Sequence, residues 1–434
     1  MIRNRFIPFF FIFLLPANVK AQEKLRLKDA VAIALEKNYD VQLSKVNKSI
    51  ADGNNQAGNA GMLPAVVVEG GYSRTDLNLS QTLADGRVIE QDAATSENIS
   101  GAARLTWTLF DGMGMFIRKS RLESLSREAE LTLRLQMENS IQQVISAYFS
   151  VQVTEQRIRA IQQLLNVDSI RVQLAVVRLE GGNGNKLDLL QARLDINTHK
   201  SQLLQEKANL ISAQENLNLI LGRDPSLLFE TADNITLQSV QADPATRDAD
   251  TRLRLATQRE QTALQWMKEA KSGRLPVIAF NAAYTYNETE NEAGFLLQNR
   301  NTGPGFGLNL QWNLFDGFRT SRTVKVAGLE YAIARLRKEQ ELMLRQQTEL
   351  KLQREYALRQ ELARTAELSH SFAQEILMVA TERLKSGLGT SLEITEAQRN
   401  FEDAATRLFE ARYQAKLTET EVLKMNGKLI EVTP

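Results

Sequence analysis

The chain has 434 residues, with 53 Lys and Arg, 52 Asp and Glu, two His and no Cys. A compact domain rarely exceeds about 250–300 residues, so this length argues against one ordinary globule. The absence of Cys excludes disulfides, thiolate metal sites, Cys nucleophiles and a lipid-modified N-terminal Cys. Two His argue against a His-based metal site, and a formal net charge of +1 argues against a nucleic-acid partner.

Residues 1–21 have the pattern of a secretory signal peptide. Arg3 and Arg5 give a basic start, residues 6–19 are largely apolar, and Val19-Lys20-Ala21 is an A-x-A-like site. The apolar run is shorter than the ~20 residues that a spanning helix needs. We therefore expect export and cleavage after Ala21, with an uncleaved anchor as the alternative. Cleavage leaves 50 Lys and Arg against 52 Asp and Glu, a net charge of −2.

Several motifs occur twice in the chain, which indicates a tandem duplication. Three motif pairs are separated by 205 residues: Trp107–Gly112 with Trp312–Gly317, Arg178–Gly184 with Arg383–Gly389, and Gly222 with Gly427. A Leu-Pro pair recurs at 63–64 and 275–276. We expect a first repeat at 22–222, a linker at 223–250, a second repeat at 251–428 and a short tail at 429–434.

The first repeat opens with a helix expected at about 27–60. The helix must end before Leu63-Pro64, because a residue that precedes Pro is pushed out of the α region. Residues 98–110 then alternate strictly between apolar and polar, which predicts a strand, and 65–77 supply its partner. The polar segment 80–97 is expected to be the loop between them. Strands of ~10 residues have the length found in membrane barrels.

Asp111-Gly112 marks the entry into the next helix, since Asp can cap a first turn and Gly permits a sharp change of direction. No Pro occurs between 64 and 225, so residues 113–180 can form one helix, roughly 100 Å long at ~1.5 Å per residue. Its apolar residues are spaced by three and four, as in coiled coils. Gly181-Gly-Asn-Gly184 breaks the helix, and another is expected at 186–221.

The second repeat follows the same order. We expect a helix at 251–272, Leu-Pro at 275–276, a strand at 277–287, a polar loop at 288–303 and a strand that includes 306–314. Asp316-Gly317, a helix at 318–385, a break at 386–389 and a helix at about 390–425 complete it. The alternating hairpins fit either an amphipathic sheet on a helix layer or a membrane sheet. The membrane interpretation requires an oligomer, because four strands cannot close a barrel.

Carboxylates follow each helix break. Asp188 lies in the first repeat, and Glu393 and Glu396 are three residues apart, on one helix face, in the second. A solvated helix face and a paired-acid hydrolase are both compatible with this pattern. His199 and His370 are expected to be surface residues or to have hydrogen-bonding partners. Because no phosphate loop, nucleophile elbow or zinc motif occurs, we expect no enzyme, cofactor or metal site.

The order of these features resembles the TolC family of outer-membrane efflux proteins over residues 24–428: a signal peptide, two halves, Leu-Pro before each hairpin, Leu-Phe-Asp-Gly after it, and Gly-containing tips. The resemblance implies a mainly α fold with membrane β, in which an α-helical barrel continues into a transmembrane β-barrel with four strands per protomer. It implies a homotrimer in the outer membrane of a Gram-negative bacterium that extends into the periplasm. Its function would be a passive exit duct for tripartite efflux or type I secretion.

The resemblance also implies partners and site residues. The partners are a periplasmic adaptor (membrane fusion) protein, an inner-membrane RND or ABC pump and outer-membrane lipid. The residues that would dock the adaptor at the tips are Arg178, Gly181, Gly182, Gly184, Arg383, Ser386, Gly387, Leu388 and Gly389. A gate would contain Asp188, Gln191, Glu393 and Glu396. Pro64, Asp111, Gly112, Pro276, Asp316 and Gly317 would be architectural. The alternative function is the periplasmic coiled-coil adaptor itself.

Overall fold

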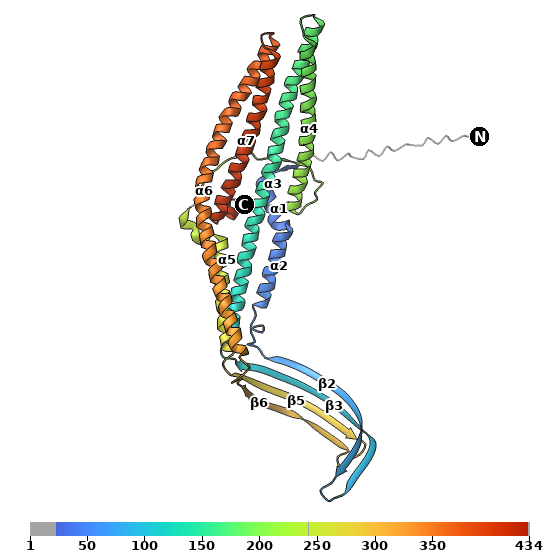
Figure 1. Ribbon diagram of the computed structural model, residues 1–434. Helices are drawn as coiled ribbons and strands as arrows, with labels where there is room; N and C mark the ends of the chain where they lie inside the picture. The colour runs from blue at the N-terminus through green and yellow to red at the C-terminus, as the bar shows by residue number, and fades with distance from the viewer. Residues whose placement is uncertain (1–22, 242, 433–434) are drawn as a thin grey trace, which may run out of the picture.

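The computed structural model describes residues 23–241 and 243–432, so the expected signal peptide lies outside the described residues. The molecule is elongated, with a four-stranded sheet at one end and two helical hairpins at the other (Figure 1). Its first elements are β1 (Glu23–Leu25), α1 (Leu27–Lys37), α2 (Tyr39–Asn54), β2 (Ala65–Thr82), β3 (Val88–Phe110), α3 (Gly114–Glu180) and α4 (Lys186–Leu221). The chain continues through β4 (Phe229–Thr231), the 3-10 helix η1 (Pro244–Ala249), α5 (Thr251–Ser272), β5 (Val277–Asn291), β6 (Gln298–Gln311), α6 (Arg319–Lys385), α7 (Ser391–Met425) and α8 (Leu429–Val432).

The sheet has the order β2-β3-β5-β6, and every neighbouring pair is antiparallel. Its register places Trp107 opposite Phe280 and Leu105 opposite Ala282, which confirms the apolar face predicted from the alternation. Among the described helices, none is both long enough and apolar enough to cross a membrane.

Both predicted loops were too long. β2 extends to Thr82 and β3 begins at Val88, so most of the predicted loop 80–97 is strand. The second loop, predicted at 288–303, is confined to residues 292–297. Polar side chains pair across the outer part of the sheet, where the Thr95 hydroxyl donates to Asp76 at 2.7 Å. Hydropathy alternation marks an apolar face, whereas strand pairing itself needs only backbone partners. β6 in turn ends at Gln311, before the predicted 312–314.

The recurring motifs meet at the junction between helices and sheet. The Trp107 indole donates to the Met62 carbonyl at 3.0 Å, and the Trp312 indole donates to the Arg274 carbonyl at 3.2 Å. Both carbonyls lie two residues before the prolines Pro64 and Pro276. In each repeat, a hydrogen bond therefore links the Leu-Pro segment to the end of the second strand of the hairpin.

The Asp-Gly pairs begin the two longest helices. Asp111 Oδ1 accepts from the Met115 N–H at 3.0 Å, and Asp316 Oδ2 accepts from the Thr320 N–H at 2.9 Å. Gly112 and Gly317 have φ angles of 70° and 67°. These contacts give the pairs the helix-entry geometry that the sequence pattern predicts.

The helix predicted at 27–60 is wrong as a single element. It breaks at Asn38, whose side chain accepts from the N–H groups of Asp40 and Val41 at 3.0 and 3.2 Å. The Asn38 amide also donates to the Ile220 carbonyl at 2.8 Å. Because Asn is a strong N-cap, it begins α2 here instead of continuing α1.

The two halves of α3 pack against different helices. Near the sheet α3 packs against α2 and α5, whereas near the tips it packs against α4 and α7. The main core lies where the partners change, and the Tyr148 hydroxyl there lies 2.8 Å from both the Leu25 carbonyl oxygen and Asp233 Oδ2, which share its one hydrogen. Burial raises the pKa of Tyr148.

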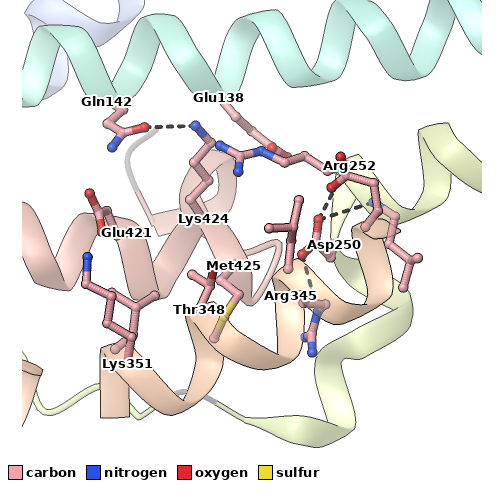
Figure 2. A pocket seen from close by; sticks show the side chains of 14 residues that line it. Glu138, Gln142, Asp250, Arg252, Arg345, Thr348, Lys351, Glu421, Lys424 and Met425 are labelled. Carbon is pink, nitrogen blue, oxygen red and sulfur yellow. Dashed lines mark hydrogen bonds and ion pairs between the residues drawn. The ribbon is translucent and has the colours of Figure 1, made fainter. Parts of the chain in front are cut away.

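A cavity of about 610 Å³ lies where α7 ends and α5 begins, between α3 and α6. Figure 2 shows the Lys424 ammonium directed at Gln142, to which it donates at 2.8 Å. Burial lowers the pKa of Lys424. Arg345 contacts Asp250 at 3.2 Å on the other side of the cavity (Figure 2). Charged side chains thus link α7 to α3 and α6 to the start of α5 around a gap in the packing.

Candidate functional site at the helical tips

The two tips are built from the same turn. At the first tip the Asn183 N–H donates to the Arg178 carbonyl at 3.0 Å, and at the second the Leu388 N–H donates to the Arg383 carbonyl at 3.0 Å. Gly182 and Gly387 have φ angles of 76° and 79°. A left-handed Gly with this hydrogen bond ends a helix in a Schellman motif. The glycines predicted for docking therefore have a backbone role in the turn.

A second glycine of each turn packs against the end of its own helix. A Cβ on Gly184 would lie 2.5 Å from the Leu179 nitrogen, and a Cβ on Gly389 would lie 2.8 Å from the Leu384 nitrogen. Real Cβ atoms do not approach so closely, so any side chain would force the turn apart. Of the remaining tip residues predicted for docking, Gly181, Arg383, Ser386 and Leu388 are exposed, with Leu388 at 74%, whereas Arg178 is half-buried.

The helices that leave the tips begin with different caps. The Asn185 side chain accepts from the Leu187 N–H at 2.9 Å to begin α4. Thr390 begins α7 with a capping box, in which its hydroxyl accepts from the Glu393 N–H at 3.2 Å and its own N–H donates to Glu393 Oε2 at 3.3 Å. Glu393, predicted as a gate residue, thus also fixes the start of its helix.

A groove of about 640 Å³ beside the second tip brings several predicted residues together. Arg383, Glu393 and Glu396 line it together with exposed apolar side chains of α6. Arg383 Nη2 lies 3.6 Å from Glu393 Oε1. Two of the four residues predicted for the gate and one residue predicted for docking therefore share one surface.

The other two gate residues lie on α4 in the first hairpin. Asp188 is exposed in the first turn of this helix. Gln191 is exposed as well, and its side chain donates to Asp195 Oδ1 at 2.9 Å. A single chain thus presents the carboxylates predicted for the gate on two separate helices, with their side chains open to solvent.

The family model of the outer membrane efflux proteins matches residues 30–223 and 245–428. The chain belongs to this family. Outer membrane efflux protein BepC of Brucella suis biovar 1 (strain 1330) is 24% identical over 363 residues, which are 82% of this chain and 77% of BepC.

Solved structures share the fold. The CmeC outer membrane channel of Campylobacter jejuni superposes with a TM-score of 0.79 at 15% identity, covering 93% of this chain and 86% of CmeC. The outer membrane protein VceC of Vibrio cholerae has a TM-score of 0.73 at 15% identity, covering 92% and 96%.

The efflux protein is therefore an exit channel of the outer membrane that extends into the periplasm, and the predicted fold class is confirmed. The same findings favour the channel over the adaptor alternative. They describe a family of channel proteins.

The structure of the efflux protein adds a contact between the tips that the sequence did not predict. Arg178 Nη2 donates to the Leu384 carbonyl at 3.0 Å, which links the end of α3 to the end of α6. The sequence marks Arg178 only as half of a repeated motif. No feature of the sequence near Arg178 predicts a hydrogen bond to a carbonyl 206 residues away.

A buried polar cluster that lies between the tips and the main core was also missed. We define the hairpin cluster as Asp168 and Arg171 on α3, Asp195 and His199 on α4, and Gln398 on α7. Arg171, 3% exposed, donates to Asp195 Oδ2 and to Gln398 Oε1, each at 2.8 Å. It also donates to the hydroxyls of Ser391 and Thr395 at 3.3 and 3.1 Å.

The carboxylate of Asp168 is the other centre of the hairpin cluster. Asp168 is fully buried; its Oδ2 lies 2.5 Å from His199 Nδ1, and its Oδ1 accepts from the Gln398 amide at 2.7 Å. His199 therefore has a hydrogen-bonding partner, as the sequence predicts. His370 packs between the rings of Phe401 and Phe409, at 5.4 and 6.3 Å between centroids.

Proposed function

We propose that three copies of the chain close into one channel, with the sheets in the outer membrane and the helical tips facing the cell. Within the described residues β2 and β6 are the edges of the sheet, and unpaired strand edges are not tolerated in lipid. Three sheets of four strands would give a 12-stranded barrel, which removes the edges. Apolar side chains on one face of the sheet support a lipid contact, since Val68 is 80% exposed and Phe306 is 83% exposed.

The tips are the proposed docking site for the helical hairpins of a periplasmic adaptor. The observation that carries this proposal is that two equivalent turns end side by side, joined by the contact of Arg178 with Leu384. Leu187, Leu388 and Leu392 stand on this end surface with 66, 74 and 70% of their area exposed. Such apolar side chains around rigid turns suit helical partners.

The proposed gate is a ring of carboxylates from Asp188, Glu393 and Glu396, with Gln191 at the fourth position. Around a threefold axis these carboxylates would repel each other and attract cations, so a narrow ring would make the constriction selective for cations. The channel itself is passive in this proposal. An inner-membrane RND or ABC pump would supply the energy, and adaptor binding at the tips would favour the open state.

A pair of tip variants tests the docking proposal. Leu388→Asp should abolish efflux of a dye from cells that express this protein with its own adaptor and pump, because it puts a charge on the proposed contact. Gln205→Glu, which adds a charge at an exposed position of α4 outside the tips and the gate, should retain dye efflux. Each variant must reach the outer membrane in the wild-type amount and, in detergent, have the mass of three chains. Efflux at wild-type rate by Leu388→Asp would reject docking, and a monomeric wild-type particle would reject the trimer.

A further inference from the structure

The net charge of the hairpin cluster depends on whether His199 is protonated. Asp168 and Asp195 supply two carboxylates, whereas Arg171 supplies one guanidinium. An imidazolium at His199 makes the cluster neutral, and a neutral imidazole leaves one excess negative charge. Buried charges are strongly disfavoured unless they are paired. Loss of the His199 proton would therefore destabilise the packing of the helices around the cluster.

The excess charge would fall on the most deeply buried group. Asp168 has no exposed surface, and its two oxygens contact only one cationic side chain at hydrogen-bonding distance among the described residues, His199. Its other contact is the uncharged Gln398 amide. Arg171 is already occupied by Asp195, the Gln398 carbonyl oxygen and two hydroxyls. A neutral imidazole can retain a hydrogen bond to Asp168, but it cannot compensate the charge.

The cluster also joins the two hairpins. Asp168 and Arg171 on α3 contact His199 and Asp195 on α4, and both contact Gln398 on α7. Arg171 lies nine residues before the end of α3, which is roughly 14 Å of helix at ~1.5 Å per residue. A change at the cluster is therefore well placed to alter how α4 and α7 are held just behind the tips.

We propose that His199 is a proton-controlled latch, in which the imidazolium holds α4 and α7 against α3 and its deprotonation loosens the two hairpins. The carboxylates that act on the ring are Asp168 from α3, Asp195 from α4 and Glu402 from α7, and the Arg171 guanidinium of α3 is paired with Asp195. Three carboxylates thus stand against one guanidinium, and together they favour the imidazolium.

The direction of the pH effect follows from these contacts. The hydrogen bond to Asp168 raises the pKa of His199 above its usual 6.5, against the opposing effect of burial. The latch is therefore complete below pH 6.5 and is lost as the pH rises through the raised pKa. It acts within one chain, so it stands without the trimer and without the adaptor.

Hydrogen exchange of the full-length protein in detergent tests the latch between pH 6 and pH 9. The amides of residues 160–205 and 391–405 are compared after correction for the intrinsic pH dependence of exchange. In the wild type their opening should increase by up to about tenfold per pH unit between pH 6.5 and the raised pKa of His199, and level off above that pKa, because one proton is released on opening. His199→Gln should show high exchange at pH 6 and no further increase.

His370→Gln is the matched control, because His370 also lies on a long helix and burial lowers its pKa. It should keep the wild-type profile. If His199→Gln fails to fold, Asp168→Asn removes the partner charge and should abolish the pH step instead. A flat wild-type profile, or a pH step that survives in His199→Gln or in Asp168→Asn, would overturn the proposal.

Discussion

The two helical hairpins share their plan but bury different side chains. α3 and α6 each have 67 residues, and α4 and α7 have 36 and 35. At the repeat offset of 205, Asp168, Arg171 and His199 of the first hairpin correspond to Ala373, Ile376 and Ala404 of the second. Ala373 and Ala404 are buried as well, at 5 and 2% exposure. The turn is thus the same in both hairpins because its backbone conformation requires glycine. A packed contact between helices can instead be polar or apolar, provided that the two side chains in contact are of the same kind.

The largest expected effect comes from removing the cation of the polar hairpin. Arg171→Met should lower the free energy of unfolding by about 3–5 kcal/mol, because it leaves a carboxylate and several polar groups without their buried partner. Denaturant unfolding followed by helical circular dichroism measures this loss. The equivalent change Ile376→Met should cost less than about 1.5 kcal/mol. Similar losses for the two variants would contradict the comparison.

The second prediction converts the polar pair into the alanine pair of the other hairpin. In a double-mutant cycle of Asp168→Ala and His199→Ala, we expect a coupling of about 0.5–3 kcal/mol at pH 6. Because the folded-state pKa of His199 is raised, this coupling is present below pH 6.5 and should decline as the pH rises through that pKa. Denaturant unfolding at pH 6 and pH 9 gives both values. A coupling that grows toward pH 9 would be incompatible with an imidazolium in the folded protein.

The turns should respond alike in the two hairpins. Gly184→Ala and Gly389→Ala should each destabilise by about 1–3 kcal/mol, because the new Cβ overlaps the helix backbone. Gly182→Ala, with φ of 76° but open space around it, should cost only about 1–2 kcal/mol through backbone strain. Thermal unfolding ranks the three variants. A tolerated Gly389→Ala beside a damaging Gly184→Ala would show that the two turns differ.

Much of the fold followed from local signals in the sequence. The absence of Pro, the Gly-containing tips and the recurring motifs locate the long helices within one or two residues, since these features act on nearby backbone. The hairpin cluster was not predicted because its partners come from α3, α4 and α7. One signal was available. Asp168 and Arg171 continue the helical spacing of Leu164 and Val167, which are buried. The second repeat has small or apolar residues, Ala373 and Ile376, at the positions equivalent to Asp168 and Arg171.

The smallest effect concerns the equivalent arginines of the tips. Arg178 donates across to the Leu384 carbonyl at 3.0 Å, whereas Arg383 stays in its own hairpin, 3.4 Å from the Leu388 carbonyl. Each change to Gln removes one hydrogen bond to a carbonyl and should alter stability by about 1 kcal/mol; Arg178 is half-buried and Arg383 is exposed. The difference should appear in geometry: Arg178→Gln frees one tip from the other, and Arg383→Gln does not.

Spin labels measure this difference, since the chain has no Cys of its own. Asn183→Cys and Ser386→Cys place one label on each tip, and labelled chains are diluted with unlabelled ones so that only distances within a chain contribute. Arg178→Gln should broaden the distance distribution, while Arg383→Gln should leave it at the wild-type width. Equal broadening would mean that the cross-tip contact of Arg178 does not set the spacing of the hairpins. The hairpin cluster, together with the hydrogen bond from Gln202 on α4 to Glu402 on α7 at 3.2 Å, would then still join the hairpins behind the tips.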